Sequence, residues 1–145
     1  MPSILYQNIK FTFTSFLDAV EFHKTSNIKI KELKDGSTII LSNGAKKYYK
    51  NIKSNLDKDN YIYFNSMTAS FGYIDEKDSD KYFITKGCFV FRLNDEYRDK
   101  VILKYMFYCL EARHKEEFRK LLHGSCQKFV SIGAFKESLN LCPII

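Results

Sequence analysis

The hydrophobic pattern of the chain changes period near Arg98, and this change restricts the folds that are open to it. Before that point, short runs of β-branched and aromatic residues are separated by turn signals such as Asp35-Gly36, a pattern typical of strands. Between residues 98 and 122 the apolar residues recur every three or four positions instead, which indicates a helix with a buried face. The order of the two patterns predicts a mixed α+β fold.

Local sequence signals place the expected elements along the chain. Expected strands or extended segments cover residues 3–12, 28–30, 37–41, 61–64, 82–84, 88–93 and 139–142. Short helices are expected at residues 131–135 and after Ser15, which with Asp18 has the spacing of a reciprocal N-terminal cap. Gly124 should end the long helix, and Gly87 should supply a positive φ angle to a tight connection between two strands. Residues 42–53 show no periodicity and are expected to form a loop.

The long helical segment divides into two halves with different surroundings. The first half is expected to be buried along two adjacent stripes, formed by Ile102, Met106 and Cys109 and by Leu103, Phe107 and Leu110. The second half is expected to be exposed, because Glu111 and Glu116 precede Lys115 and Lys120 by the spacing of ion pairs on a helix surface.

The chain has the length and composition of one globular domain. Its 145 residues are 45% hydrophobic and include 13 Phe and 10 Tyr, which can bury large areas in one core. We expect a curved, mostly antiparallel sheet with a helical hairpin late in the chain. Residues 1–27 would form an N-terminal extension with a short helix, and residues 28–145 the main domain. No apolar run approaches the roughly 18 residues of a membrane span, and the N-terminus lacks the features of a signal peptide, so a soluble cytoplasmic protein is expected.

The cysteines do not have the spacing of a metal site. Cys88, Cys109, Cys126 and Cys142 form no C-x-x-C pair, and structural zinc sites take their ligands from close pairs. We therefore expect neither a metal ion nor another cofactor, and we expect the thiols to be reduced and mostly buried.

Positive charge is concentrated in one part of the sequence. Residues 23–58 contain nine Lys and three acidic residues, in a chain whose net charge is +6. Two interpretations of this Lys-rich stretch remain open, a solvated surface and a face that binds anions.

The residues that three enzyme classes require are incomplete or absent. A DNA methyltransferase needs a Gly-rich cofactor loop and an Asn/Asp-Pro-Pro-aromatic turn, and this turn is impossible because the two prolines stand at positions 2 and 143. The triplets at residues 32–34 and 75–77 match only the minimal acid-x-Lys fragment of metal-dependent nucleases. His123, Ser125 and Cys126 are sequence neighbours without an evident orienting acid, which disfavours a catalytic triad. We therefore expect no catalytic residue.

Four segments in a fixed order carry a resemblance to a known family. They are residues 30–44 ending in Ser42-Asn43-Gly44, residues 66–74 ending in Gly72-Tyr73-Ile74, residues 83–91 around Thr85-Lys86-Gly87, and residues 123–131 beginning with His123-Gly124. In this order they resemble the target-recognition domain of the specificity subunits of type I restriction-modification systems, a fold shared with type IIG and type IIB enzymes. Family members continue past the position of Pro143 into a long helix, so we expect an excised domain or a half-subunit.

The resemblance implies a bacterial module that reads a sequence in duplex DNA and catalyses no reaction itself. Its implied partners are double-stranded DNA and the adenine methyltransferase and restriction subunits or domains of such a system. Lysines would contact phosphates, and short polar side chains would contact base edges. The residues expected to contact DNA are Asn43, Gly44, Lys46, Lys47, Tyr48, Lys50, Lys53, Ser66, Thr68, Ser70, Lys86, Ser125, Gln127 and Lys128.

Other interpretations of the same residues stay open. Gln127 has the side chain to pair with adenine, but it is equally able to hydrogen-bond the backbone beside Gly124. Tyr61, Tyr63 and Tyr82 are expected to pack in the core. Two other functions also fit the chain: a protein-interaction or regulatory module that docks on a restriction-modification subunit, and a non-specific single-stranded nucleic-acid binder with Tyr stacking platforms.

Overall fold

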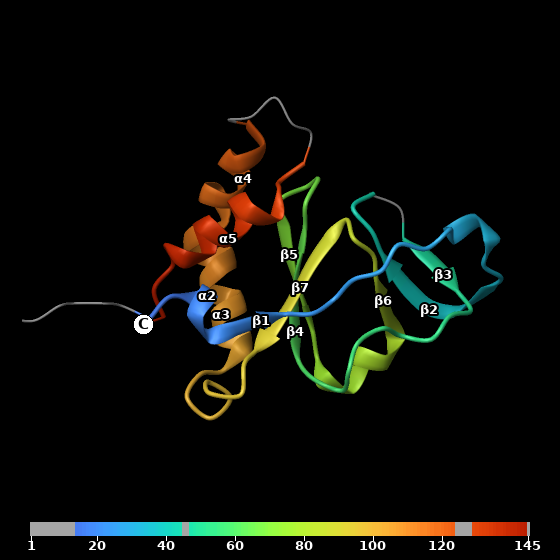
Figure 1. The fold of residues 1–145 in the computed structure, drawn as a ribbon, viewed down its shortest axis with the longest axis horizontal. Coiled ribbons are helices and arrows are strands. Elements are labelled where there is room, and N and C mark those ends of the chain that lie inside the picture. Colours follow the sequence, from blue (N-terminus) through green and yellow to red (C-terminus); the bar gives the residue numbers. More distant parts are fainter. Residues whose placement is uncertain (1–13, 45–46, 124–128, 145) are drawn as a thin grey trace, which may run out of the picture.

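The chain folds into three layers (Figure 1). The computed structural model describes residues 14–44, 47–123 and 129–144. Helices form one outer layer, a four-stranded sheet forms the middle layer and a three-stranded sheet forms the other outer layer. The predicted α+β class is confirmed, with most of the helices late in the chain.

The described elements follow one another in a simple order. They are α2 (Phe16–Ala19), β1 (Val20–Phe22), the 3-10 helix η1 (Ile30–Glu32), β2 (Asp35–Leu41), β3 (Tyr48–Lys50), β4 (Tyr61–Asn65), β5 (Ser70–Ile74), the 3-10 helix η2 (Glu76–Lys81), β6 (Tyr82–Ile84), β7 (Cys88–Leu93), α3 (Leu103–Cys109), the π-helical turn η3 (Leu110–His114), α4 (Lys115–His123) and α5 (Ile132–Asn140).

The strands form two sheets where a single curved sheet was expected. The four-stranded sheet has the order β1-β7-β4-β5, and all its neighbours are antiparallel. The three-stranded sheet has the order β3-β2-β6, in which β2 pairs with β3 antiparallel and with β6 in parallel. Strand pairing is therefore mostly antiparallel, as predicted, but it is divided between two sheets.

The middle sheet is covered on both faces, which explains why its strands are apolar almost without interruption. In β4, Ile62 and Phe64 belong to the core on the helical side, whereas Tyr61 and Tyr63 pack in the core between the sheets. Because successive side chains of a strand point to opposite faces, a strand with two covered faces carries apolar residues at nearly every position.

Phe135 of α5 is the centre of the core on the helical side. Its ring is fully buried, and its centroid lies 4.4 Å from that of Phe64 and 5.3 Å from that of Phe118. Four further rings lie within 6.1 Å, namely those of Phe22, Phe71, Phe89 and Phe91. One side chain thus connects α5 to α4 and to every strand of the middle sheet.

Several local predictions are confirmed. The hydroxyl of Ser15 accepts a hydrogen bond from the N–H of Asp18 at 3.2 Å, and the Asp18 carboxylate accepts one from the N–H of Ser15 at 3.2 Å. The strands expected at residues 37–41, 61–64, 82–84 and 88–93 correspond to β2, β4, β6 and β7. In the long helical segment, Leu103, Met106, Cys109 and Leu110 are buried as predicted.

Other local predictions are wrong because contacts between distant residues override the local signal. Residues 28–30 form no strand, and η1 begins at Ile30 instead. The expected loop after β2 contains β3, which is held by pairing with β2. Residues 139–142 are not a strand, because α5 continues to Asn140. Residues 3–12 and Gly124 lie outside the described residues.

The long helical segment is interrupted by η3, where the helix widens by one residue per turn. Ile102, which was expected on a buried stripe, occupies the N-cap position of α3 without a side-chain capping bond and is 73% exposed. Within the described ion pairs, Glu116 pairs with Arg119 at 3.4 Å rather than with Lys120. The expected pair of Glu111 with Lys115 spans η3, where the α-helical spacing no longer holds.

No helix in the described part of the chain is both long enough and apolar enough to cross a membrane.

The two ends of the described chain are joined. The N–H of Phe16 donates to the carbonyl of Cys142 at 2.9 Å, and the N–H of Ile144 donates to the carbonyl of Thr14 at 2.9 Å. The hydroxyl of Ser15 also donates to the side-chain oxygen of Asn140 at 2.9 Å. We call this contact between residues 14–16 and 140–144 the terminal clasp. Through it, α2 packs in the same core as α5.

An ion-pair network holds the end of the middle sheet at which β4 begins. Asp59 accepts a hydrogen bond from Arg98 at 2.6 Å and lies 3.6 Å from Arg92. Burial acts to raise the pKa of Asp59, but hydrogen bonds from Arg98 and from the backbone N–H of Asn60 outweigh it, so the pKa lies below its ordinary value.

The substitution Asp59→Asn is expected to lower the free energy of unfolding by about 1–2 kcal/mol at neutral pH, because it removes a charge-assisted hydrogen bond. A carboxylate with a lowered folded pKa stabilises the fold above its unfolded pKa, about 3.9, and loses this contribution as the pH falls through the folded pKa. The melting temperatures of variant and wild type should therefore differ by several degrees at pH 7 and converge as the pH falls below about 4. A difference that stays constant across this range would contradict the assignment.

Candidate functional site

Three connections between strands meet at one end of the middle sheet. They are residues 42–44 and 47 after β2, residues 66–69 between β4 and β5, and residues 85–87 between β6 and β7. The side-chain amide of Asn65 donates to the carbonyl of Ser42 at 3.3 Å, and the hydroxyl of Ser66 donates to the carbonyl of Gly87 at 2.7 Å. We call this region the loop end; it lies in the upper part of Figure 1.

A fourth segment reaches the loop end from the helical layer. The N–H of Val130 donates to the carbonyl of Ser66 at 2.8 Å, so Phe129 and Val130 stand beside the turn at residues 66–69. Described parts of all four segments on which the sequence resemblance rests therefore meet at one place. Of the predicted contact residues, Lys46, Ser125, Gln127 and Lys128 lie outside the described residues.

Gly87 is required at the loop end for the close approach of two backbones. None of the described glycines has a positive φ angle, so the reason predicted for Gly87 is wrong. A Cβ atom on Gly87 would lie 2.6 Å from the Cβ atom and 2.8 Å from the backbone nitrogen of Asn43. The missing side chain lets the loop after β2 lie directly on the turn before β7.

A groove of about 230 Å³ opens between the two sheets at the loop end. Four of the predicted contact residues line it, namely Gly44, Lys47, Thr68 and Ser70. Tyr63 lines it too, and its ring covers Gly72, its partner on the neighbouring strand. Burial raises the pKa of Tyr63, so its hydroxyl remains a neutral hydrogen-bonding group at physiological pH.

The turn at residues 66–69 is held in one conformation. The side-chain oxygen of Asn65 accepts hydrogen bonds from the N–H of Met67 at 2.9 Å and of Thr68 at 3.2 Å. Ala69 is buried with a φ angle of 51°, a conformation that costs a non-glycine residue about 1–2 kcal/mol. The hydroxyls of Thr68 and Ser70 lie 2.6 Å apart, and both residues are exposed. The turn therefore presents a fixed pair of hydroxyl groups.

Two predicted contact residues have structural partners instead. Ser66 is 4% exposed, and its hydroxyl is bonded to Gly87. The Lys50 side chain is 17% exposed and pairs with Asp35 at 3.0 Å. Ser66 therefore braces the loop end from inside, whereas Lys50 is paired at the start of β2, the end of that strand opposite the groove. Neither residue lines the groove.

The other predicted residues are distributed unevenly. Lys86 is exposed in the turn at residues 85–87, and Asn43 is half-buried beside it. Lys53 is exposed but does not line the groove, and Tyr48 borders a different hollow with Ile28 and Ile30. Among the described lysines after β2, only Lys47 lines the groove. The basic surface is therefore narrower than the sequence predicted.

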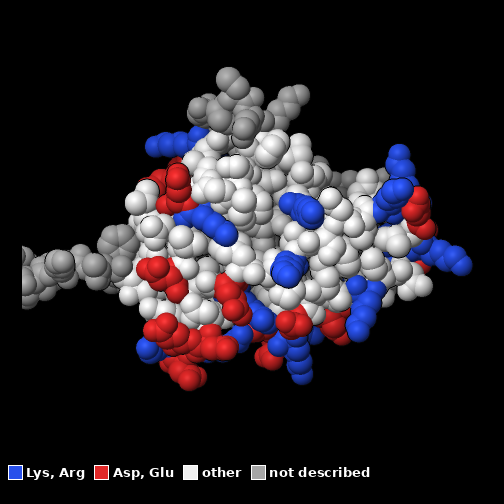
Figure 2. All heavy atoms as spheres, viewed as in Figure 1, with Lys and Arg blue, Asp and Glu red and all other residues white. Residues whose placement is uncertain are grey.

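Charge distinguishes the two ends of the middle sheet. Residues 42–47, 65–70 and 85–88 include lysines and no acidic residue. Acidic residues adjoin the opposite ends of β4, β5 and β7, and they are Asp57, Asp59, Asp75, Glu76, Asp78, Asp80, Asp95, Glu96 and Asp99. Figure 2 shows most of the acidic side chains of the viewed face along its lower margin, with Lys and Arg side chains among them. Lys58, Lys77, Lys81, Arg98 and Lys100 lie among these acidic residues. The opposite end therefore carries mixed charge with an acidic excess, whereas the charged residues of the three connections at the loop end are all basic.

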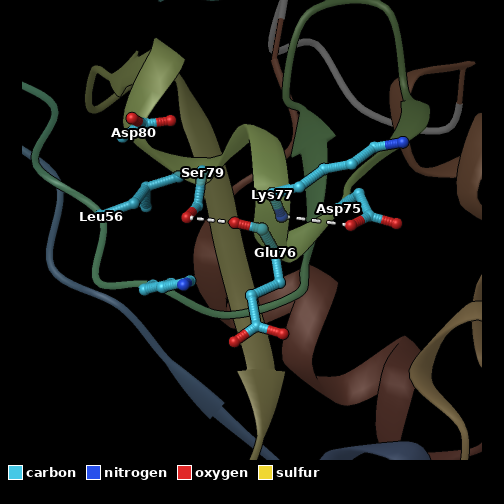
Figure 3. Close-up of a pocket in the computed structure, with 7 residues that line it drawn as sticks. Leu56, Asp75, Glu76, Lys77, Ser79 and Asp80 are labelled. Carbon is cyan, nitrogen blue, oxygen red and sulfur yellow. Dashed lines mark hydrogen bonds between the residues drawn. The ribbon is translucent and has the colours of Figure 1, made fainter.

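A second hollow, of about 610 Å³, lies at the acidic end (Figure 3). It includes one of the two nuclease-like triplets. The Asp75 carboxylate accepts a hydrogen bond from the N–H of Lys77 at 3.1 Å and caps η2, while the Glu76 side chain points away from Asp75 in Figure 3. In the part of the chain that the structure describes, no group of three His, Cys, Asp or Glu side chains could hold a metal ion. Asp75 therefore has a structural role here, as the cap of η2.

The described cysteines are buried thiols. Cys88, Cys109 and Cys142 are free and buried, which confirms the prediction for these three. Burial raises the pKa of Cys88 and of Cys142 to about 12, so both stay protonated and are poor nucleophiles at neutral pH. Cys126 lies outside the described residues.

The structure adds residues that the sequence analysis missed. Asn65 organises the turn at residues 66–69, and Tyr63, which was expected to have only a packing role, lines the groove. Met67 and Phe129 are 44% and 51% exposed beside it. A signal existed for Met67, because it stands between small polar residues typical of a turn. None existed for Phe129, because its neighbour in space is more than 60 positions away in the sequence.

Comparison with known proteins assigns the fold. Neither a family model nor a curated protein matches the sequence. The crystal structure of the type I restriction-modification system S subunit from M. genitalium matches with a TM-score of 0.62 over 85% of this chain, at 16% sequence identity. The chain covers 32% of the length of that subunit. It therefore has the fold of a part of an S subunit, and the predicted resemblance to a target-recognition domain is confirmed at the level of fold.

Proposed function

We propose that this chain recognises a short sequence in duplex DNA through its loop end, as the non-catalytic specificity module of a restriction-modification system. The convergence of four sequence segments on one acid-free end of the middle sheet is the observation that supports this most strongly. The S-subunit fold supports the same function.

The proposed contacts divide into two kinds. Lys47 and Lys86, together with Lys46 and Lys128, would neutralise phosphates and release counterions. Thr68 and Ser70 would contact base edges, because their hydroxyls are exposed and fixed relative to the groove. Asn43 and Gln127 have side chains that can pair with adenine. The acidic end would keep the duplex in one orientation, since it repels phosphates.

The double variant Lys47→Glu/Lys86→Glu is expected to weaken duplex binding at least tenfold in electrophoretic mobility shift titrations, because a charge-assisted hydrogen bond contributes about 1.5–3 kcal/mol. The salt dependence of the dissociation constant should also become shallower, by about one unit of slope for each phosphate that is no longer neutralised. The matched control is Lys58→Glu/Lys77→Glu, which makes the same change in net charge at the acidic end. It should bind almost as wild type does.

Selection from random duplexes then separates affinity from specificity. Thr68→Ala/Ser70→Ala should bind with the same salt dependence as wild type but prefer its selected sequence less, by about 1–3 kcal/mol for each base edge that the variant can no longer read. If Lys47→Glu/Lys86→Glu and Lys58→Glu/Lys77→Glu weaken duplex binding equally, net charge alone governs binding. Preference for single strands without sequence selectivity would support the single-stranded binder instead.

A protein-interaction role has one observation in its favour. Ile102, Tyr105 and Tyr108 are 73%, 49% and 56% exposed along one side of α3, the kind of apolar surface that contacts other proteins. We propose that this side of the module faces the methyltransferase or restriction subunits or domains of the same system. If the wild type binds no duplex at low salt, this docking role replaces DNA recognition as the best explanation of the fold.

A further inference from the structure

Two large apolar side chains are exposed at the otherwise polar loop end. Met67 stands at the tip of the turn between β4 and β5 and is 44% exposed, and Phe129 is 51% exposed. The hydrogen bond between the carbonyl of Ser66 and the N–H of Val130, at 2.8 Å, joins the residues next to them. The groove beside them is lined by Lys47, Thr68 and Ser70, and also by apolar residues that include Leu41 and Phe71. Two exposed apolar side chains therefore stand next to this hydrogen bond, one on each of the two segments that it joins. We call Met67 and Phe129 together the apolar tip.

The supporting backbone is rigid where the tip begins. Asn65 accepts hydrogen bonds from the N–H groups of Met67 and Thr68, and the N–H of Ala69 donates to the carbonyl of Asn65 at 2.9 Å. Ser66 is anchored to Gly87. Because the turn cannot rearrange freely, Met67 is held outside the core even though Ala69, two residues later, is buried. The turn thus keeps Ala69 in a strained backbone conformation and at the same time leaves the Met67 side chain exposed to water.

We propose that Met67 and Phe129 act as a wedge that enters the base stack of the bound duplex. This inference rests on the proposed function and extends it. Apolar side chains, including Met and Phe, inserted beside a base step partly unstack it and bend the duplex. Pyrimidine–purine steps unstack most easily, so the wedge adds sequence preference at a step that no hydrogen bond reads.

The size and setting of the tip favour a duplex over a protein as its partner. A stable protein interface covers about 800 Å² on each side with an apolar centre, far more than two side chains offer. The neighbouring segments contain lysines and no acidic residue. Their positive charge can therefore attract the phosphates that flank the unstacked base step.

Fluorescence of 2-aminopurine tests the wedge directly. The probe is placed at successive positions of the duplex that the wild-type protein selects from a random pool, and donor–acceptor dyes at the duplex ends report bending. Wild type is expected to raise 2-aminopurine fluorescence severalfold at one step and to bend the duplex by about 20–90°. Met67→Ala and Phe129→Ala should each remove most of the fluorescence increase and the bend, and should raise the dissociation constant about tenfold. Met67→Leu, which keeps the apolar volume, should retain both signals.

The control is Leu141→Ala, because Leu141 is also apolar and 72% exposed but lies at the terminal clasp. It should leave fluorescence, bend and affinity unchanged. Selective binding by the wild type with no unstacked step would overturn the wedge while leaving DNA recognition intact. Weaker binding by Met67→Ala with an unchanged bend would also overturn it, because Met67 would then contact a groove wall. Failure of the wild type to bind any duplex would overturn both proposals.

Discussion

Replacement of Phe135 by alanine should lower the free energy of unfolding by about 4 kcal/mol, a large part of the roughly 5–15 kcal/mol that stabilises an ordinary domain. The ring is fully buried and contacts six other phenylalanine rings in α4 and in the four strands of the middle sheet. Its removal leaves a cavity that these rings cannot all fill, because they are attached to different elements. The measurement is urea denaturation followed by circular dichroism.

Phe129→Ala is the matched control for this substitution, because it removes the same side chain from a half-exposed position. It should change stability by less than about 1 kcal/mol, since much less apolar area is buried there. Phe135→Leu should cost less than Phe135→Ala, because it keeps more of the volume. Equal losses for Phe129→Ala and Phe135→Ala would mean that Phe135 is not the centre of the core.

Gly72→Ala should lower the free energy of unfolding by about 2–3 kcal/mol, although it adds only one methyl group. The added Cβ atom would lie 2.1 Å from Cζ of Tyr63, so the Tyr63 ring would have to leave its position over Gly72. This ring lines the groove at the loop end, and DNA binding should weaken with stability. Thermal and urea denaturation measure the first effect, and mobility shift titration measures the second.

A double-mutant cycle isolates the cause of that loss. In the Tyr63→Ser background the clash is absent, so Gly72→Ala should cost much less than in wild type. Gly133→Ala is a second control, because a Cβ atom there would meet nothing within 4 Å. Alanine is the better helix former, so this change in α5 should be neutral or stabilising by up to about 1 kcal/mol. A large loss from Gly72→Ala in the Tyr63→Ser background would show that backbone entropy or twist, not the ring, sets the requirement for glycine.

The features of the fold that could be predicted are those set by residues close together in the sequence. The capping box of Ser15 and Asp18 is contained in four residues, and the apolar runs of β4 and β7 are continuous, so both could be predicted. The division into two sheets could not, because the parallel pairing of Ile40 with Phe83 joins residues far apart in the sequence. Strand β3 has only three residues and exists through its pairing with β2.

The candidate site was predictable as a set of segments but not residue by residue. Ser66 and Thr68 are both small hydroxyl residues of one turn, yet the first is buried against Gly87 and the second is exposed in the groove. Lys47 and Lys50 stand in the same basic stretch, yet only Lys50 is paired with Asp35. Which face of a short strand or turn a residue occupies depends on tertiary contacts, and composition carries no information about them.

The terminal clasp determines where anything joined to this module must stand. Helix α5 runs from the segment beside the loop end to the clasp, and its nine residues span roughly 13 Å. Chain that leaves from residue 14 or from residue 144 therefore departs from neighbouring attachment points on the helical layer. A tether, a dye or a further subunit fastened at either point would leave the grooved end free to meet its ligand.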